Sequence, residues 1–138
     1  MGKNRNLKHH NDWQTPPEFY EQLDKEFNFD FDPCPLHADF DGLTIEWGQR
    51  NFINPPYSRK LKEAFVKKGI QESKFGKLCV FILPVSTSTE LFHDYIQPNA
   101  KDIRFVRGRL KFKGLNGSGH IETKGTGMHD SMIVIFGE

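Results

Sequence analysis

The sequence predicts an α/β protein built around one mostly parallel sheet, and three observations carry this prediction. Apolar runs typical of strands alternate along the chain with segments of helical periodicity. One run, residues 78–83, is apolar throughout and is bounded by Pro84, as expected for a strand that is buried on both faces. Such strands need helices on both sides, so we expect an α/β layer structure that ends in a C-terminal antiparallel hairpin.

Length and composition exclude several classes of protein. The 138 residues are enough for one hydrophobic core, and the aromatic share of 13% indicates a globular chain. No apolar run approaches the roughly 18 residues that cross a bilayer, and the polar N-terminus lacks the apolar segment of a signal peptide. We therefore expect a soluble, cytoplasmic protein. The net charge of +1 favours no partner by itself.

The cysteines indicate neither a disulfide framework nor a metal site. Cys34 and Cys79 are the only two, and both stand in apolar or proline-rich surroundings. Cys34 and His37 have the spacing of half a zinc site, but no second pair of Cys or His residues matches them. We therefore expect reduced thiols and no metal.

The chain divides into a basic tail at residues 1–12 and one domain at residues 13–138. Thr15 has the features of a helix N-cap, because proline follows at the first helical position and Glu18 stands at the third. This helix is expected to continue to about Phe27. Further strands are expected at residues 28–32, 52–53, 78–83, 103–106, 110–112 and 132–136, further helices at 61–76 and 86–96, and irregular structure at 33–48 and 114–127.

Residues 54–58, Asn-Pro-Pro-Tyr-Ser, directly follow a short strand and are the most informative stretch of the chain. Each proline fixes its own φ and biases the preceding residue toward extended geometry, so the carbonyl groups of Asn54 and Pro55 are held rigidly. Rigid oxygen acceptors beside the ring of Tyr57 suit a planar base with an exocyclic amine. The alternative is an ordinary Pro-Pro turn in which Tyr57 is a half-buried surface aromatic.

Asp32 and Pro33 end the preceding strand in a similar way. Open α/β sheets bind their ligands at the carboxyl ends of inner strands. We therefore expect the strand ends at Asp32 and Asn54 to lie side by side at a binding site.

The tetrapeptide Asn54-Pro55-Pro56-Tyr57 resembles the (D/N/S)PP(Y/F) motif of amino-methyltransferases, which methylate adenine N6, cytosine N4 or glutamine amides. Over nearly its whole length, the chain resembles the phage-type, Dam-like family of DNA adenine-N6 methyltransferases. The matching segments are residues 13–17, 31–34, 41–43, 47, 52–58, 83–84, 104–112 and 131–132. The resemblance implies a Rossmann-like class I methyltransferase fold, S-adenosylmethionine as cofactor, and a minimal or absent target-recognition domain.

The resemblance also implies roles for individual residues. It assigns catalysis to Asn54, Pro55, Pro56 and Tyr57. It assigns contact with the cofactor to Trp13, Thr15, Pro16, Asp32, Pro33, Cys34, Asp41 and Asn54. Trp13 and Trp47 either wall the adenosine pocket or belong to the core. The loop after Asp32 departs from the wider class because it lacks the usual Gly-x-Gly, which leaves the affinity for the cofactor open.

The exocyclic amine of adenine is a poor nucleophile because its lone pair is delocalised into the ring. If the side-chain oxygen of Asn54 and the carbonyl oxygen of Pro55 accept its two hydrogens, the nitrogen is biased toward a pyramidal geometry that aims the lone pair at the methyl donor. Tyr57 is expected to stack on the flipped base, and such stacking contributes about 1–3 kcal/mol. No covalent intermediate is required.

DNA contact is expected from one residue next to the motif and from a basic segment: Ser58, Arg104, Arg107, Arg109, Lys111 and Lys113. If this segment is extended, the cations from Arg107 to Lys113 share one side of it. The alternative is a solvated strand face. The loop at residues 114–127 is either a place for target contacts or a plain connection.

The leading function is site-specific methylation of adenine N6 in DNA. One alternative is a non-catalytic nucleic-acid-binding or cofactor-binding module that retains the fold, and another is a methyltransferase of protein glutamine. The basic segment and the whole-length resemblance favour the DNA enzyme. We expect DNA but no membrane as a partner, a monomer or homodimer, and the host cytoplasm if the gene belongs to a phage.

Overall fold

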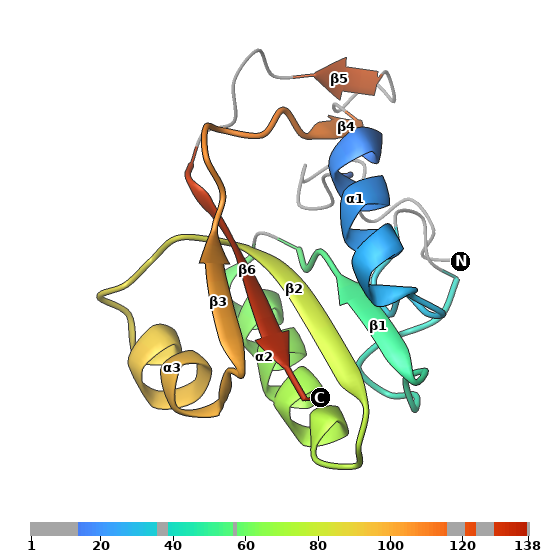
Figure 1. The fold of residues 1–138 in the computed structure, drawn as a ribbon, viewed down its shortest axis with the longest axis vertical. Helices are drawn as coiled ribbons and strands as arrows, with labels where there is room; N and C mark the ends of the chain where they lie inside the picture. The colour runs from blue at the N-terminus through green and yellow to red at the C-terminus, as the bar shows by residue number, and fades with distance from the viewer. Residues whose placement is uncertain (1–13, 36–38, 57, 116–120, 124–128, 138) are drawn as a thin grey trace.

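The computed structural model describes residues 14–35, 39–56, 58–115, 121–123 and 129–137 (Figure 1). Residues 113–115 and 121–123 are described by their backbone alone. The predicted tail at residues 1–12, Trp13 and Tyr57 lie outside the described residues. Within the described part of the chain, no helix is long and apolar enough to span a membrane.

A four-stranded sheet with the order β1-β2-β6-β3 forms the centre of the fold. Its strands are β1 (Arg50–Ile53), β2 (Leu78–Pro84), β3 (Asp102–Phe105) and β6 (Ser131–Phe136). β1 and β2 are parallel, whereas β6 lies antiparallel between β2 and β3. The sheet is therefore mixed: β1, β2 and β3 point the same way and β6 runs against them, which agrees in part with the predicted mostly parallel sheet. β6 is reversed because the chain enters it at the edge where β3 ends and runs back across the sheet (Figure 1).

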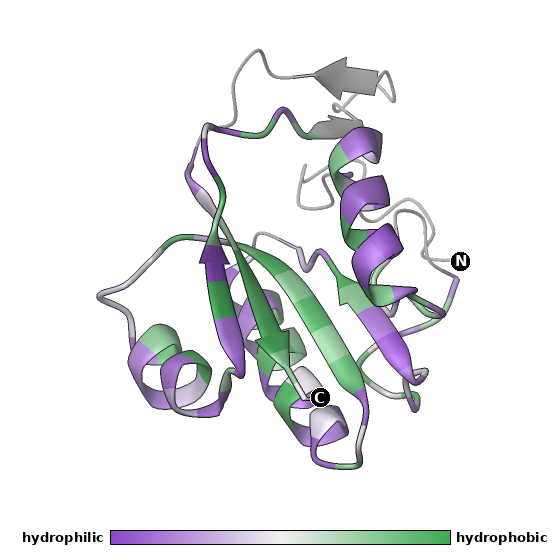
Figure 2. Ribbon diagram, in the orientation of Figure 1, coloured by the Kyte–Doolittle hydropathy of each residue, from purple (hydrophilic) through white to green (hydrophobic). Residues whose placement is uncertain are grey.

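Helices cover both faces of the sheet, as predicted. α1 (Pro17–Phe27) packs on one face in a hydrophobic cluster with Val80 and Ile82 of β2. α2 (Arg59–Ser73) and the π-helix η1 (Leu91–Ile96), which continues into α3 (Gln97–Asn99), lie on the other face. They form a second cluster with Phe81 and Leu83. Alternate residues of one strand thus enter two clusters, which explains why β2 is apolar along nearly its whole length (Figure 2).

The first helix begins with a different cap from the predicted one. Pro16, and not Thr15, is the N-cap residue of α1. The hydroxyl oxygen of Thr15 instead accepts a hydrogen bond from the side chain of Asn54. The helix ends at Phe27, as predicted, and Asn28 at its C-cap adopts the left-handed conformation with a φ of 54°.

The strand predicted at residues 28–32 does not form. Phe31 alone makes an isolated bridge to Asn51 of β1. Side-chain carboxylates accept hydrogen bonds from backbone amides in this region. The amide of Phe29 donates to the carboxylate of Asp24 at 2.9 Å. The amide of Arg50 donates to the carboxylate of Asp30 at 3.1 Å. Such local bonds compete with a strand ladder.

The C-terminal third differs most from the prediction. Residues 106–112 form no strand, and Gly108 turns the backbone with a φ of 76°. β4 (Lys113–Leu115) and β5 (Ile121–Thr123) form a separate two-stranded antiparallel sheet in a region that was expected to be irregular. η1 begins five residues after Ser86, where a helix was expected to start, and the hydroxyl of Thr89 accepts the amide of Phe92.

Candidate active site

The end of β1 and the segment after Phe31 meet at the carboxyl edge of the sheet, which confirms the predicted juxtaposition. Asn54 follows β1, and Asp32 follows the residue that bridges to β1. Both line a pocket of about 600 Å³ beside α1, here called the first pocket. Thr15 and Cys34, two further residues predicted to contact a cofactor, line the same pocket.

The side chain of Asn54 is bound to another element of the pocket wall. Its Nδ2 donates a hydrogen bond of 3.0 Å to Oγ1 of Thr15, a residue that is 6% exposed and lies 39 positions away in sequence. Because Nδ2 is the donor, Oδ1 is the acceptor end of this amide. Pro55 and Pro56 are buried and carry the chain from Asn54 toward α2 with φ fixed at both positions.

The carboxylate of Asp32 is partly withdrawn from water. Burial raises its pKa to about 6, although a hydrogen bond of 2.8 Å from the amide of Cys34 acts in the opposite direction. Pro33, the next residue, is fully buried. A cationic ligand would stabilise the ionised form of Asp32, because its charge would replace the hydration that burial removes.

The loop that carries Asp41 packs against Pro33. A Cβ atom at Gly42 would lie 2.0 Å from the carbonyl oxygen of Pro33, so this close approach needs glycine. Asp41 is exposed, accepts the amide of Leu43 at 3.0 Å, and is not a wall residue of the first pocket. Trp47, which is 3% exposed, donates its Nε1–H to the carbonyl of Gly42. Trp47 therefore belongs to the core and is not a wall residue of the first pocket.

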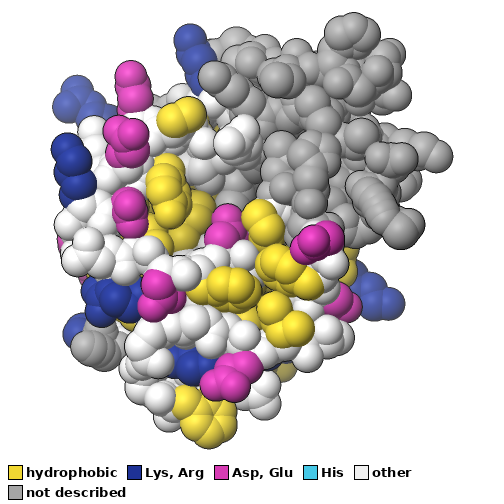
Figure 3. All heavy atoms as spheres, turned by 90° about the vertical axis from the view of Figure 1, so that its right-hand side faces the viewer, with side chains coloured by type: hydrophobic (Ala, Val, Ile, Leu, Met, Phe, Trp, Pro, Cys, Tyr) yellow, Lys and Arg dark blue, Asp and Glu magenta, His cyan; other side chains and the backbone are white. Residues whose placement is uncertain are grey.

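α1 supplies a wall of the first pocket that the sequence analysis did not identify. Pro17, Tyr20, Glu21 and Asp24 line it with the i, i+3, i+4, i+7 spacing of one helix face, which was a readable signal. With Asp32 the pocket has three carboxylates, and no lysine or arginine is among its described wall residues. Burial, followed by the charges of Asp24 and Asp32, raises the pKa of Tyr20. Acidic side chains also border a hydrophobic strip on this side of the molecule (Figure 3).

A second pocket, of about 290 Å³, lies at the start of α2. Its wall includes Arg59 and Lys62 of α2, Leu83 at the end of β2, and Met132 at the start of β6. Residues 54–58 connect β1 to α2 and so lead from the first pocket to the second. The predicted DNA contact Ser58 is the N-cap residue of α2. The rigid Asn-Pro-Pro segment therefore stands between two cavities.

Two of the predicted DNA-binding cations are held in ion pairs. The terminal nitrogens of Arg104 donate to both carboxylate oxygens of Glu26 on α1, at 2.8 and 2.7 Å. Nε of Arg109 donates to the carboxylate of Asp130 at 3.1 Å. These bonds direct both guanidinium groups toward protein carboxylates, and the contact of Arg104 and Arg109 with phosphates stays a prediction.

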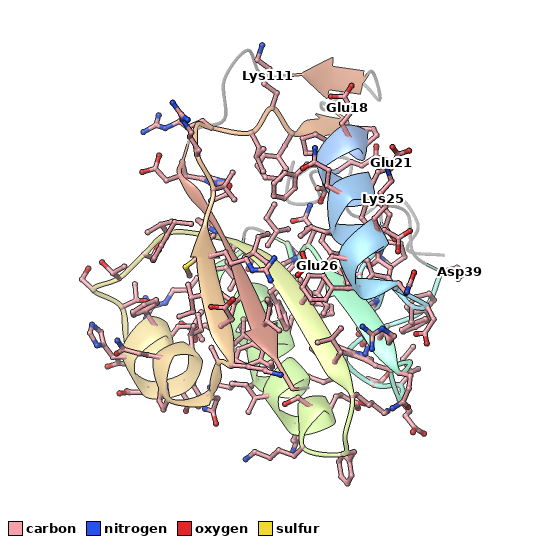
Figure 4. The ribbon with its side chains drawn as sticks, in the orientation of Figure 1. Glu18, Glu21, Lys25, Glu26, Asp39 and Lys111 are labelled. Atoms are coloured by element: carbon pink, nitrogen blue, oxygen red, sulfur yellow. The ribbon has the colours of Figure 1, made fainter. Side chains whose placement is uncertain are left out.

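The remaining predicted cations do not share one face of a strand. That expectation is wrong, because residues 106–112 form no strand and the chain bends at Gly108. Arg107 and Lys111 are exposed, and neither forms an ion pair with a residue that the structure describes. Lys111 projects outward at the top of the view, well beyond the end of β3 (Figure 4). The side chain of Lys113 lies outside the described residues.

The fold and the pocket are compatible with the methyltransferase class: an α/β sheet carries an acidic pocket at its carboxyl edge, beside an Asn-Pro-Pro segment. The chain belongs to the DNA N-6-adenine-methyltransferase (Dam) family, whose model matches residues 3–138. Comparison with curated proteins gives no match. In the described ranges, no group of three or more His, Cys, Asp or Glu residues is arranged to hold a metal ion.

Proposed function

We propose that this protein transfers a methyl group from S-adenosylmethionine to N6 of adenine at specific sites in DNA. Membership of the Dam family supports the reaction. The hydrogen bond between Asn54 and Thr15 is the observation that carries the proposal, because it joins the motif to the acidic pocket. The catalytic unit is the single domain at residues 13–138, acting as a monomer or a homodimer.

The first pocket is the proposed cofactor site, and its residues fit the cofactor. Its volume of about 600 Å³ lies within the range of small-molecule sites. Its three carboxylates attract the sulfonium and ammonium groups, and Phe52 offers an apolar surface to the adenosine. Thr15, Asp32 and Cys34 line the pocket and are proposed to contact the cofactor, while Pro16, Pro33 and Asp41 are proposed to shape it. When bound, S-adenosylmethionine supplies an electrophilic methyl group.

Asn54 and Pro55 prepare the target amine. Oδ1 of Asn54 and the carbonyl oxygen of Pro55 accept the two N–H groups, which favours a pyramidal nitrogen whose lone pair is available. The bond to Thr15 fixes the Asn54 amide before substrate binds, so less rotational freedom is lost on binding. After transfer, the nitrogen loses one proton to water. Tyr57 stacks on the base.

The second pocket is the proposed site of the flipped base. Its volume of about 290 Å³ is at the lower end of ligand pockets, as expected for a single base. Ser86, Thr89 and Glu90 in its wall offer polar partners to the edge of a base. Ser58, Arg107 and Lys111 remain proposed contacts to the DNA around it.

Methyl transfer from labelled S-adenosylmethionine, followed by nucleoside analysis, tests this function. The proposal expects the label in N6-methyladenine of DNA. Label in cytosine would change the target base, and label in protein would support a glutamine methyltransferase. Cofactor binding without transfer to any acceptor would support the non-catalytic module.

A further inference from the structure

Charged side chains divide the carboxyl edge of the sheet into an acidic half and a basic half. α1, beside the first pocket, carries four carboxylates and one lysine over Pro17–Phe27. Glu18, Glu21 and Glu26 are exposed, and Glu18 and Glu21 project outward from the helix (Figure 4). A face of this charge attracts a cationic cofactor and repels DNA phosphates.

The first turn of α2, beside the second pocket, has the opposite charge. Arg59, Lys60 and Lys62 lie in it, and Arg59 and Lys62 line that pocket. The side chain of Arg59 is 82% exposed and pairs with Glu63 across one helical turn. Exposed pairs of this kind contribute only about 0.3–0.5 kcal/mol, so a phosphate can replace the carboxylate. Lys60 and Lys62 form no ion pair with any described residue.

The surroundings of Lys62 favour an anion at this position. Burial lowers its pKa; the charge of Glu63 raises it, and the charge of Arg59 lowers it. Two cations therefore repel each other at the wall of the second pocket, and a phosphate between them would relieve that repulsion. Glu63 and Glu90 also line this pocket, so the cationic contact belongs at its rim, next to the exposed Arg59 and Lys60.

We propose that Arg59, Lys60 and Lys62 bind phosphates of the substrate DNA, so that the duplex lies against the first turn of α2 and not against α1. The inference rests on the proposed function, which makes DNA the substrate. It places the polyanion next to the pocket for the base and leaves the acidic pocket to the cofactor. It also differs from the predicted basic segment, in which Arg104 is held by two hydrogen bonds to Glu26.

A salt series of DNA binding tests this surface. Each phosphate contact on duplex DNA contributes about −0.9 to the slope of log affinity against log salt. The triple variant Arg59→Ala, Lys60→Ala, Lys62→Ala is expected to have a slope shallower by about two to three units. The matched control Lys25→Ala, Lys74→Ala, Lys101→Ala removes the same charge from exposed residues outside this turn and should keep the parent slope.

A parent-like slope in the triple variant, or an equal loss in the control, overturns the proposal. If the triple variant fails a thermal melt, Lys60→Gln alone decides, because this exposed side chain should still change the slope by about one unit. The function and the surface fail in distinguishable ways. If the triple variant shows the expected slope change but the parent does not methylate adenine, the function is contradicted and the surface is not. If the parent methylates adenine but the triple variant keeps the parent slope, the surface is contradicted and the function is not.

Discussion

The buried carboxylate of Asp32 makes cofactor binding depend on pH. Its pKa of about 6 means that it is about nine-tenths ionised at pH 7 and about one-tenth ionised at pH 5. If the cationic cofactor binds the ionised form, its affinity falls by about tenfold between these two values. Asp32→Asn, which keeps the shape but not the charge, should bind weakly at both pH values and lose the dependence.

The same carboxylate opposes folding when no cation is present. Its folded pKa lies above the ordinary value of 3.8, so its contribution to stability is greatest below about pH 4 and is lost as the pH rises through 6. A shift of about two pKa units corresponds to at most about 3 kcal/mol at pH 7. Asp32→Asn should therefore raise the melting temperature of the free protein at pH 7 while it weakens the cofactor complex.

Calorimetric titration with S-adenosylmethionine at pH 5, 6 and 7, together with melts of the free protein, measures both effects. Parent affinity that stays constant over this range, or a variant that binds as tightly as the parent at pH 7, would refute the electrostatic role of Asp32. Glu18→Gln is the matched control, because it removes one exposed carboxylate of α1 that is not in the pocket wall.

Three further substitutions test the supporting structure. Thr15→Val removes the acceptor of the motif amide and should slow methyl transfer by about tenfold or more, whereas Thr15→Ser should retain activity; equal rates would show that the bond is dispensable. Gly42→Ala should lower the free energy of unfolding in urea by about 1–3 kcal/mol, since its Cβ would meet the carbonyl oxygen of Pro33; a free energy of unfolding equal to the parent's would contradict this packing. Lys77→Met should cost about 1–3 kcal/mol because it takes the 2.6 Å ion pair from buried Glu72, which keeps only its 2.9 Å pair with Lys68, and an unchanged midpoint would argue against it.

Local patterns were enough to locate the centre of the site. The rule that α/β sheets bind ligands at the carboxyl ends of strands placed Asn54 beside Asp32, and the structure has both in one pocket. The helical spacing from Pro17 to Asp24 was also present in the sequence, but polar residues at this spacing do not by themselves distinguish a pocket wall from a solvated helix face.

Features that depend on distant pairing were not predictable in this way. The sequence predicted an antiparallel C-terminal hairpin but not the insertion of β6 between β2 and β3, because hydrophobic pattern does not encode strand order. The alternating cations after Arg104 suggested a strand, whereas the chain bends at Gly108. Arg104 itself pairs with Glu26, which lies 78 positions away and could not be identified as its partner from the sequence. The sequence around Thr15 has the features of a helix N-cap, but its hydroxyl oxygen accepts a hydrogen bond from the side chain of Asn54, 39 positions away.

The rate of methyl transfer by Asn54→Ala at saturating S-adenosylmethionine is the most direct test of the central claim, that the Asn54 amide prepares the amine beside an acidic cofactor pocket. A single-turnover assay on adenine-containing DNA, with the calorimetric affinity for the cofactor measured alongside, separates chemistry from binding. The account predicts a loss of about a hundredfold or more in rate and a cofactor affinity within a few fold of the parent. A variant that keeps more than about a tenth of the parent rate would contradict it, because removing one preorganised polar contact at a reacting centre costs far more than that.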